Sequence, residues 1–272
     1  MKPTDFSPNF DYFPVPEIIK PFSFADIIRE RMSKGVTLNR PLKLLHANLS
    51  AIKNEVVTQN QDWIFQVCGE VGVGKSTLAL ELAMFLDPTF DMSTQMIWEM
   101  SDWARFNRND LYGNTPFKVM LFDEAVSMLF SREGTKGENT DLIKWLTKAR
   151  ACNYYVIFVI PNPWSLDLKI REERSKTMLF TWKNKEQKNQ RRYYSWYNAS
   201  QLSGIAQNQK NASKLLRNPK EFIKRFRPSF TEAFPRLEPA VETAYLKYKK
   251  TDYRAFTDGL IKKYTPKEKK KK

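Results

Sequence analysis

Residues 69–76 carry the most informative pattern in the chain and read Gly69-Glu70-Val71-Gly72-Val73-Gly74-Lys75-Ser76. They fit G-x-x-x-x-G-K-[ST], in which glycines accept positive φ angles and let backbone N–H groups close on phosphate oxygens. The apolar run Trp63–Cys68 before this stretch predicts a strand, and Lys75–Leu86 after it predicts a helix that stops ahead of Pro88. A strand, a glycine-rich turn and a helix in this order predict a phosphate-binding loop. A chance glycine-rich turn is a poor alternative in this context.

Each part of this loop has an expected role in nucleotide binding. Lys75 reaches the β- and γ-phosphates, and the Ser76 hydroxyl is a ligand for Mg²⁺. The N-terminus of the following helix points the positive end of its dipole at the same oxygens. The residues that we expect to contact the nucleotide are Gly69, Glu70, Val71, Gly72, Val73, Gly74, Lys75, Ser76 and Thr77.

Two adjacent acids follow a second apolar run. Residues 119–122 predict a buried strand, and Asp123 and Glu124 come directly after it. Ligand sites of parallel sheets lie at the carboxyl ends of the strands, so we expect Asp123 to hold the water shell of Mg²⁺ opposite Ser76. Glu124 is then placed to polarise the attacking water as a general base. The alternative is that both acids merely begin a helix, since Asp and Glu favour the first turn.

The positive charge of the chain is concentrated in its last third. The net charge is +15, and residues 183–272 hold 24 Lys and Arg against 8 Asp and Glu, which leaves residues 1–182 close to neutral. Such a region indicates a polyanionic partner, most often nucleic acid and sometimes an anionic membrane surface. Between residues 183 and 197 the cations are interleaved with aromatic rings, which can stack on bases. The run Lys269–Lys272 alone is equally consistent with a solubilising tail.

Composition excludes several classes of protein. The longest strong apolar run, Tyr154–Ile160, is far short of the roughly 20 residues that span a bilayer, and Met1–Lys20 lacks the apolar block of a signal peptide. Two cysteines, Cys68 and Cys152, are too few for a disulfide scaffold and indicate a reducing compartment. The single histidine, His46, excludes a multi-His metal site, and we expect it to pack on a helix.

Strands that alternate with helices from residue 62 to 182 predict an α/β fold with a parallel sheet and helices on both faces. We divide the chain into an N-terminal arm with helices (1–60), a nucleotide-binding core (61–200) and a basic, mostly helical extension (201–272). Within the first part we expect an extended arm over residues 1–22, a helix at Phe24–Ser33 and another from Leu42 to about Asn54. The other expected elements are strands at Gln95–Trp98, Lys118–Phe122, Thr177–Trp182 and Arg192–Tyr197, a polar loop at Ser131–Asn139, a helix at Thr140–Arg150, and helices beyond Asn198, broken by Pro219, Pro228, Pro235 and Pro239.

Residues 62–182 resemble the FtsK–HerA class of P-loop motors. The features that carry the resemblance beyond the phosphate loop are Lys148-Ala149-Arg150-Ala151, the strand Tyr154–Ile160, the stretch Pro161-Asn162-Pro163-Trp164-Ser165-Leu166-Asp167 and the strand near Met178–Phe180. The class includes DNA-translocating and viral genome-packaging ATPases, and the phage zonula-occludens-toxin-like ATPases are close relatives. The resemblance implies a RecA-like P-loop fold, ATP with Mg²⁺, double-stranded DNA as a partner, and an oligomeric ring such as a hexamer.

The resemblance also assigns roles to single residues. Asn162 takes the position of the Gln that senses the γ-phosphate, and its alternative is a turn residue before Pro163. Arg150 lines up with the arginine that such rings insert into the neighbouring ATP site, although Arg at a helix C-terminus is favourable on its own. Arg171 and Arg174 are rival candidates for that arginine, and the preferred interpretation of both is a solvated helix face.

Together these features predict a cytoplasmic ATP-hydrolysing DNA motor of the translocase or genome-packaging type, in the host cytoplasm if the gene is viral. Two alternatives remain. An AAA-type replication initiator or helicase loader would carry a helical lid after the last core strand, where the sequence instead predicts a hairpin. A nucleotide-dependent module that binds nucleic acid or a membrane would not need the base Glu124. A small-molecule kinase is disfavoured for the same reason and by the charge of the last third.

Overall fold

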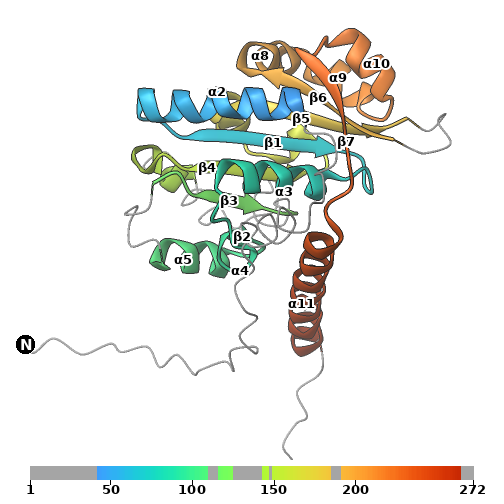
Figure 1. The fold of residues 1–272 in the computed structure, drawn as a ribbon. Coiled ribbons are helices and arrows are strands. Elements are labelled where there is room, and N and C mark those ends of the chain that lie inside the picture. Colours follow the sequence, from blue (N-terminus) through green and yellow to red (C-terminus); the bar gives the residue numbers. More distant parts are fainter. Residues whose placement is uncertain (1–41, 110–115, 125–142, 147–148, 185–190, 265–272) are drawn as a thin grey trace, which may run out of the picture.

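The computed structural model describes residues 42–109, 116–124, 143–146, 149–184 and 191–264. Within these residues, seven strands form one sheet in the order β2-β3-β4-β1-β5-β6-β7 (Figure 1). The strands are β1 (Trp63–Gly69), β2 (Met96–Ile97), β3 (Val119–Phe122), β4 (Tyr155–Ile160), β5 (Ser175–Lys183), β6 (Arg192–Asn198) and β7 (Phe230–Phe234). The α-helices are α2 (Lys43–Gln59), α3 (Lys75–Leu86), α4 (Met92–Gln95), α5 (Met100–Asn109), α8 (Ala199–Gln207), α9 (Gln209–Leu215), α10 (Pro219–Arg225) and α11 (Pro239–Tyr264).

The sheet is mostly parallel. Strands β2, β3, β4, β1 and β5 run in one direction, while β6 and β7 add to the β5 edge in antiparallel pairs. The predicted α/β fold with flanking helices is therefore confirmed, and so is the hairpin of β5 and β6. Because β1, β3 and β4 are parallel, their carboxyl ends meet at one edge of the sheet, which is where the phosphate loop and the two acids lie.

Apolar side chains fill both faces of this sheet. Residues of β1 alternate between the faces, as a strand buried on both sides requires: Phe65 and Val67 point to one, Ile64 and Cys68 to the other. The first apolar layer lies between the sheet and helices α2 and α3, and also receives Val241 from α11. The second layer contains residues of α5, α8, α9 and α10 on the opposite face. The two layers hold the central strand β1 rigidly, and with it the loop that follows.

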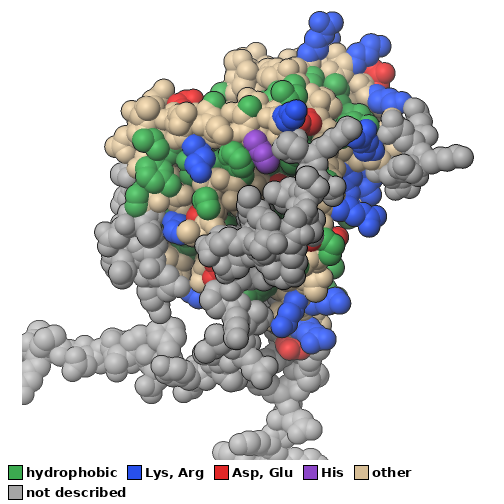
Figure 2. Space-filling model, in the orientation of Figure 1, with side chains coloured by type: hydrophobic (Ala, Val, Ile, Leu, Met, Phe, Trp, Pro, Cys, Tyr) green, Lys and Arg blue, Asp and Glu red, His purple; other side chains and the backbone are tan. Residues whose placement is uncertain are grey.

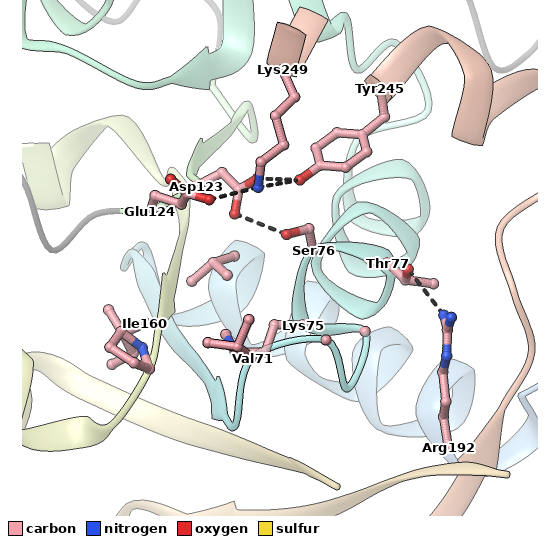
Figure 3. Close-up of a pocket in the computed structure, with 14 residues that line it drawn as sticks. Val71, Lys75, Ser76, Thr77, Asp123, Glu124, Ile160, Arg192, Tyr245 and Lys249 are labelled. Carbon is pink, nitrogen blue, oxygen red and sulfur yellow. Dashed lines mark hydrogen bonds and ion pairs between the residues drawn. The ribbon is translucent and has the colours of Figure 1, made fainter. Parts of the chain in front are cut away.

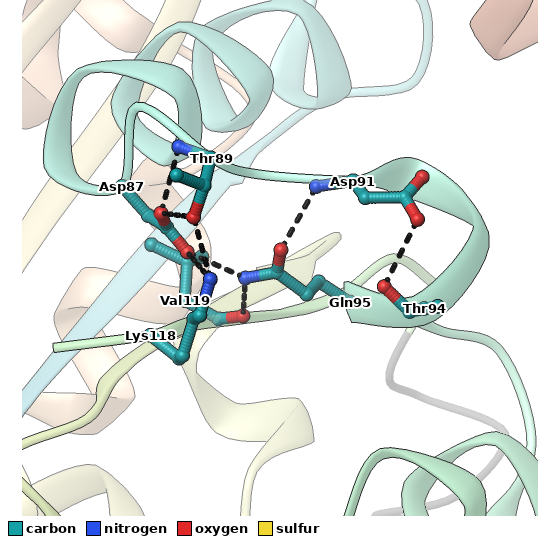
Figure 4. A network of polar contacts seen from close by, with 7 residues as sticks. All are labelled: Asp87, Thr89, Asp91, Thr94, Gln95, Lys118 and Val119. Atoms are coloured by element: carbon teal, nitrogen blue, oxygen red, sulfur yellow. Dashed lines mark hydrogen bonds and ion pairs between the residues drawn. The ribbon is translucent and has the colours of Figure 1, made fainter. Parts of the chain in front are cut away.

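A buried polar network fixes the start of β3 (Figure 4). The Gln95 amide nitrogen donates to Asp87 Oδ2 at 2.8 Å and to the backbone oxygen of Val119 at 2.9 Å, and its oxygen accepts from the Asp91 N–H at 2.8 Å. Lys118 Nζ donates to Thr89 Oγ1 at 2.5 Å and lies 3.5 Å from Asp87 Oδ2. A fully paired network of this kind specifies one arrangement. It ties the end of α3 to the strand that carries the acids.

Helix α2 receives its N-terminal cap from the far end of the chain. Its N-cap residue Leu42 has no side chain that can accept a hydrogen bond. Instead, the Glu232 carboxylate of β7 accepts from the N–H groups of Leu44 and Leu45 at 3.3 and 3.2 Å, and from Tyr194 OH at 2.6 Å. A carboxylate is favourable here because the first N–H groups of a helix lack partners and carry positive partial charge. Strand β7 thus joins the N-terminal helix to the sheet.

Several sequence predictions differ from the structure. The helix predicted to end near Asn54 continues to Gln59, and only residues 143–146 of the helix predicted over Thr140–Arg150 are described as α-helical; Arg150 lies in a 3₁₀ helix, η1 (Ala149–Cys152). The helices predicted beyond Asn198 are present as α8 to α11, but the sequence analysis missed β7, which joins the sheet between α10 and α11. Pro219 and Pro239 begin helices α10 and α11 and do not interrupt any.

Four predicted features lie outside the described residues: the arm over residues 1–22, the helix Phe24–Ser33, the loop Ser131–Asn139 and the tail Lys269–Lys272. Among the residues that are described, His46 lies in α2 and its ring stacks on Phe85 of α3 at a centroid distance of 4.5 Å, which confirms that it is a packed helix residue. In the same part of the chain, no helix combines the length and the apolar character needed to cross a membrane.

Candidate nucleotide-binding site

The phosphate loop joins β1 to α3 and needs glycine at three points. Gly69, Gly72 and Gly74 have φ angles of +146°, +76° and +99°, in the region that side chains disfavour. Gly74 is the N-cap of α3, so the first N–H groups of this helix face the loop. A Cβ at Gly69 would lie 2.2 Å from the backbone oxygen of Thr181 on β5. The loop therefore begins in close contact with the neighbouring strand.

Lys75 lies in the first turn of α3 and folds back over the loop. Its Nζ donates to the backbone oxygens of Gly69 and Glu70, both at 2.9 Å. Partial burial lowers the pKa of Lys75, and the nearby charges of Asp123 and Glu124 oppose that shift. These contacts place the ammonium group over the carbonyl edge of the loop, inside the predicted phosphate site.

Asp123 follows β3 and meets Ser76, as the sequence predicts. Its residue is only 1% exposed, and its Oδ1 accepts a hydrogen bond from Ser76 Oγ at 3.0 Å. Its other oxygen, Oδ2, accepts from Tyr245 OH at 2.7 Å. Burial raises the pKa of Asp123, whereas the hydrogen bonds from Tyr245 and Ser76 and the charge of Lys249 act in the opposite direction. Both carboxylate oxygens thus have donors.

Glu124 lines the site and has an unusual backbone conformation. Its φ is +55°, in the left-handed region, which is costly for a residue other than Gly and is often found at functional sites. Its side chain is 66% exposed and forms an ion pair with Lys249, with 2.6 Å between Oε1 and Nζ. The structure therefore places Glu124 beside the cavity with its carboxylate facing a cation.

Helix α11 contributes two residues that the sequence analysis missed. Tyr245 is 8% exposed, contacts Asp123 through its hydroxyl and stacks on Trp98 with ring centroids 6.4 Å apart. Lys249, one turn further along, contacts Glu124 and lies 6.0 Å from the Trp98 ring centroid. The only available signal was the spacing of four residues, which places Tyr245 and Lys249 on the same face of a helix. That spacing does not indicate what the face contacts.

These groups line one cavity of about 630 Å³ (Figure 3). Arg192, at the start of β6, reaches into it from the side of Thr77, with its Nη1 3.4 Å from Thr77 Oγ1. The lining residues are Val71, Gly72, Gly74, Lys75, Ser76, Thr77, Asp123, Glu124, Val159, Ile160, Pro161, Arg192, Tyr245 and Lys249. Three cations, Lys75, Arg192 and Lys249, thus surround a space that suits a polyphosphate.

The oxygen groups of this cavity also fit Mg²⁺. A buried carboxylate and a hydroxyl face each other at Asp123 and Ser76, and both are hard oxygen donors. Mg²⁺ is typically held by one or two carboxylates together with substrate phosphates and water. Ser76 and Asp123 are therefore the residues that would hold the ion beside a bound nucleotide.

The other predicted residues lie away from this cavity. Asn162 is the N-cap residue of the 3₁₀ helix η2 (Pro163–Ser165) and lines a neighbouring cavity of about 280 Å³ together with Gly69 and Glu70. Arg150 is exposed and precedes β4, so it lies toward the amino ends of the strands, opposite the phosphate loop. It cannot contact the nucleotide site of its own chain, and its role toward a neighbouring subunit stays a prediction.

The interpretation of Arg171 and Arg174 as a solvated helix face is wrong. Their segment is a π-helix, η3 (Lys169–Arg174), that leads into β5. Arg171 is 8% exposed, and its guanidinium lies 4.9 Å from the Trp164 ring centroid. Arg174 forms an ion pair with Asp62 and donates to the backbone oxygen of Leu146. Both side chains are engaged within the chain because η3 packs against the sheet.

Solved structures similar to this chain include the two that follow, while no protein-family model and no curated protein matches its sequence. The N-terminal domain of zonular occludens toxin from Neisseria meningitidis gives a TM-score of 0.40 at 12% identity, over 65% of this chain and 96% of that one. The genome packaging NTPase B204 from Sulfolobus turreted icosahedral virus 2, in complex with AMP, gives 0.34 at 11% identity, over 53% and 95%. Both are of the kinds that the sequence resembles.

Proposed function

We propose that this protein hydrolyses ATP and uses the energy to move DNA, as a translocase or genome-packaging motor that works in an oligomeric ring. The observation that carries the hydrolytic part is the meeting of Ser76 and Asp123 at 3.0 Å in a cavity that Lys75 and Glu124 also line. A phosphate loop, a metal-holding pair and a carboxylate base in one cavity are the parts that nucleotide hydrolysis needs.

Each residue has a defined task in this reaction. The N–H groups at the start of α3 and the Lys75 ammonium bind the phosphates. Ser76 and Asp123 would hold Mg²⁺, which would supply positive charge to offset the charge of the phosphates. Glu124 accepts a proton from water, whose oxygen forms a bond to the γ-phosphorus while the bond from that phosphorus to the β–γ bridging oxygen breaks. The products are ADP and inorganic phosphate.

The proposal of DNA as the partner is supported by exposed cations on one part of the molecule. Residues 208–227 contain seven Lys and Arg and one acid, Glu221, and all seven cations are exposed. Figure 2 shows Lys and Arg side chains over the α8–α10 region. Such a surface neutralises backbone phosphates without reading sequence. The seven are Lys210, Lys214, Arg217, Lys220, Lys224, Arg225 and Arg227.

The exposed position of Arg150 supports the ring. Because it lies at the opposite edge of the sheet from the phosphate loop, only a neighbouring subunit could receive its guanidinium beside a nucleotide. An arginine supplied in trans stabilises charge on the transferred phosphoryl group and raises rates about 10³- to 10⁵-fold in enzymes that use one.

The first experiment is ATP turnover by the purified protein, with and without long double-stranded DNA, with Lys75→Ala as the blank. We expect turnover that rises several-fold with DNA and is lost in the variant. An ATP turnover rate that does not change when DNA is added would contradict the proposed motor and favour a loader or membrane-associated ATPase.

A matched pair of variants tests the exposed cations of residues 208–227 as a DNA-binding surface. Lys220→Gln should reduce the slope of log DNA affinity against log salt concentration by about one, and Lys169→Gln, exposed on η3, should leave that slope unchanged.

A further inference from the structure

Helix α11 reaches the site with its N-terminal half and then extends away from the body of the molecule (Figure 1). Tyr245 anchors it there: the side chain is buried, its hydroxyl donates to Asp123 Oδ2 at 2.7 Å, and its ring stacks on Trp98. Since residues four apart share a helix face, this anchor points the side chain of Lys249 in the same direction. Lys249 therefore lies beside Asp123 and Glu124, although it is far from the phosphate loop in the sequence.

The position of Lys249 would place its side chain near the γ-phosphate end of a bound nucleotide. In a phosphate loop of this kind Lys75 would reach the β- and γ-phosphates, and Ser76 and Asp123 would hold a metal ion beside them. A general base must lie within about 3 Å of the attacking water, which in turn lies about 3–3.5 Å from the γ-phosphorus. Lys249 Nζ is 2.6 Å from Glu124 Oε1 and lines the same cavity. Because Lys249 lies beside Glu124, its ammonium group would lie near the γ-phosphate of a bound nucleotide and far from the α-phosphate.

The electrostatics of the cavity agree with this position. Burial alone would lower the pKa of Lys249, but its hydrogen bond to Glu124 and the nearby Tyr245 and Asp123 outweigh burial and raise it, so the side chain is a cation at neutral pH. Lys75 and Lys249 line the same cavity, so their two ammonium charges act on the same space. Figure 3 shows Lys249 and Tyr245 entering from α11, with the phosphate loop and Lys75 on the other side of the acids. A triphosphate between the two lysines would relieve their repulsion.

We propose that Lys249 binds the γ-phosphate and makes the site select a nucleoside triphosphate over a diphosphate, with Tyr245 as the residue that positions it. The inference rests on the proposed binding of ATP and names a further residue of the same site. In this role Lys249 exchanges its carboxylate partner for the phosphate, which leaves Glu124 to act on water. Helix α11 then contacts the catalytic acids differently in the triphosphate and diphosphate complexes.

The test is to measure the dissociation constants of ATP and ADP, each with Mg²⁺, for the full chain and four variants. Lys249→Met should weaken ATP about 10- to 100-fold, as expected for loss of a charged hydrogen bond, and change ADP less than twofold. Lys249→Arg should retain most of the selectivity. Tyr245→Phe should weaken ATP by a smaller factor and also spare ADP. Lys250→Met is the matched control, because Lys250 is the exposed next residue, and it should bind as the wild type does.

Three outcomes would overturn the inference. If Lys249→Met weakens ATP and ADP equally, the lysine serves only the structure of the site. If ATP binding is unchanged, Lys249 does not meet the third phosphate, and if ATP binds more tightly, the lysine only restrains Glu124. Failure of the proposed function gives a different result, since the wild type would then bind neither nucleotide above the level of Lys75→Ala. A thermal melting curve shows whether the Lys249→Met variant folds. If it does not fold, the ratio of ATP to ADP affinity of Lys249→Arg is compared with that of the wild type, and loss of the selectivity would overturn the inference.

Discussion

Gly69 belongs both to the sheet and to the phosphate loop, and the requirements of both limit this position to glycine. It ends β1, starts the phosphate loop and has a φ of +146°. A Cβ there would lie 2.2 Å from the backbone oxygen and 2.5 Å from Oγ1 of Thr181. Neither atom can yield easily, because the first belongs to the backbone of β5 and the second donates to the backbone oxygen of Cys68 at 2.9 Å. Only glycine satisfies both the angle and the space.

A comparison of two glycines in this loop separates these effects. We expect Gly69→Ala to lower the free energy of unfolding by about 3 kcal/mol or more, because it adds a backbone clash to backbone strain. Gly72→Ala should cost only about 1 kcal/mol, since φ is +76° there but no atom lies within 4 Å of the added carbon. Urea unfolding of both variants measures the difference. Equal losses would contradict the role of the contact with Thr181.

The sequence predicted the role of a site residue only where that residue belongs to a recognisable motif. Lys75, Ser76 and Asp123 could be placed together from the sequence because both motifs follow strands, and parallel strands end at a common edge. Tyr245 and Lys249 could not, because no local pattern links a late helix to that edge. Their contacts arise from the packing of α11 against the first apolar layer, which is a tertiary effect.

At the scale of elements, α2 depends on a residue that lies 188 positions after Leu44 in the sequence. The Glu232 carboxylate supplies the cap that Leu42 cannot, and Tyr194 OH holds the same carboxylate in place. We expect Glu232→Ala to destabilise the protein by about 2 kcal/mol and Glu232→Gln by about 1 kcal/mol, since the amide keeps one acceptor but loses the charge. Urea unfolding measures both changes.

The control for this experiment is Glu173→Ala, which removes an exposed carboxylate from η3 and should leave stability within about 0.5 kcal/mol of the wild type. If Glu232→Gln proves as stable as the wild type, the charge of the cap contributes nothing, and the contact stabilises α2 through hydrogen bonds alone.

Elements with their own sequence signal were predicted well, and β7 shows why others were not. The runs that became β1, β3 and β4 are apolar apart from Gln66 of β1 and are buried on both faces, so their composition alone indicates a strand. Strand β7 has only one fully buried residue, Phe234, and lies at the edge of the sheet. It is a strand because β6 offers it a free row of backbone hydrogen-bonding groups, which no property of residues 230–234 reveals.

At the scale of the whole molecule, the sheet extends across the boundaries drawn from the sequence. The predicted core of residues 61–200 excludes α2, β7 and α11, yet Leu45, Phe234 and Val241 from these elements belong to the same apolar layer as Phe65 of β1. A fragment cut at those boundaries would expose that layer to water, at a cost of about 25 cal/mol per Å² of apolar surface.

We therefore expect a fragment of residues 61–200 to lack a cooperative thermal transition that the full chain shows. Circular dichroism during heating, with the full chain as reference, measures this. A fragment that melts cooperatively near the temperature of the full chain would show that the region from β1 to β6 is an independent domain and that the remaining elements are accessory.

The central place of β1 has a consequence for how the chain is made. Its neighbours β4 and β5 are both synthesised later, so on the ribosome an entirely buried strand emerges before either partner exists. The hydrogen bond from Thr181 to the backbone oxygen of Cys68, just before the phosphate loop, cannot form until Thr181 has been added, and Tyr245 and Lys249 reach the acids later still. Strands that pair over long sequence separations fold slowly and leave apolar surface exposed meanwhile. Newly made chains should therefore need a chaperone, and nucleotide can stabilise only those that are nearly complete.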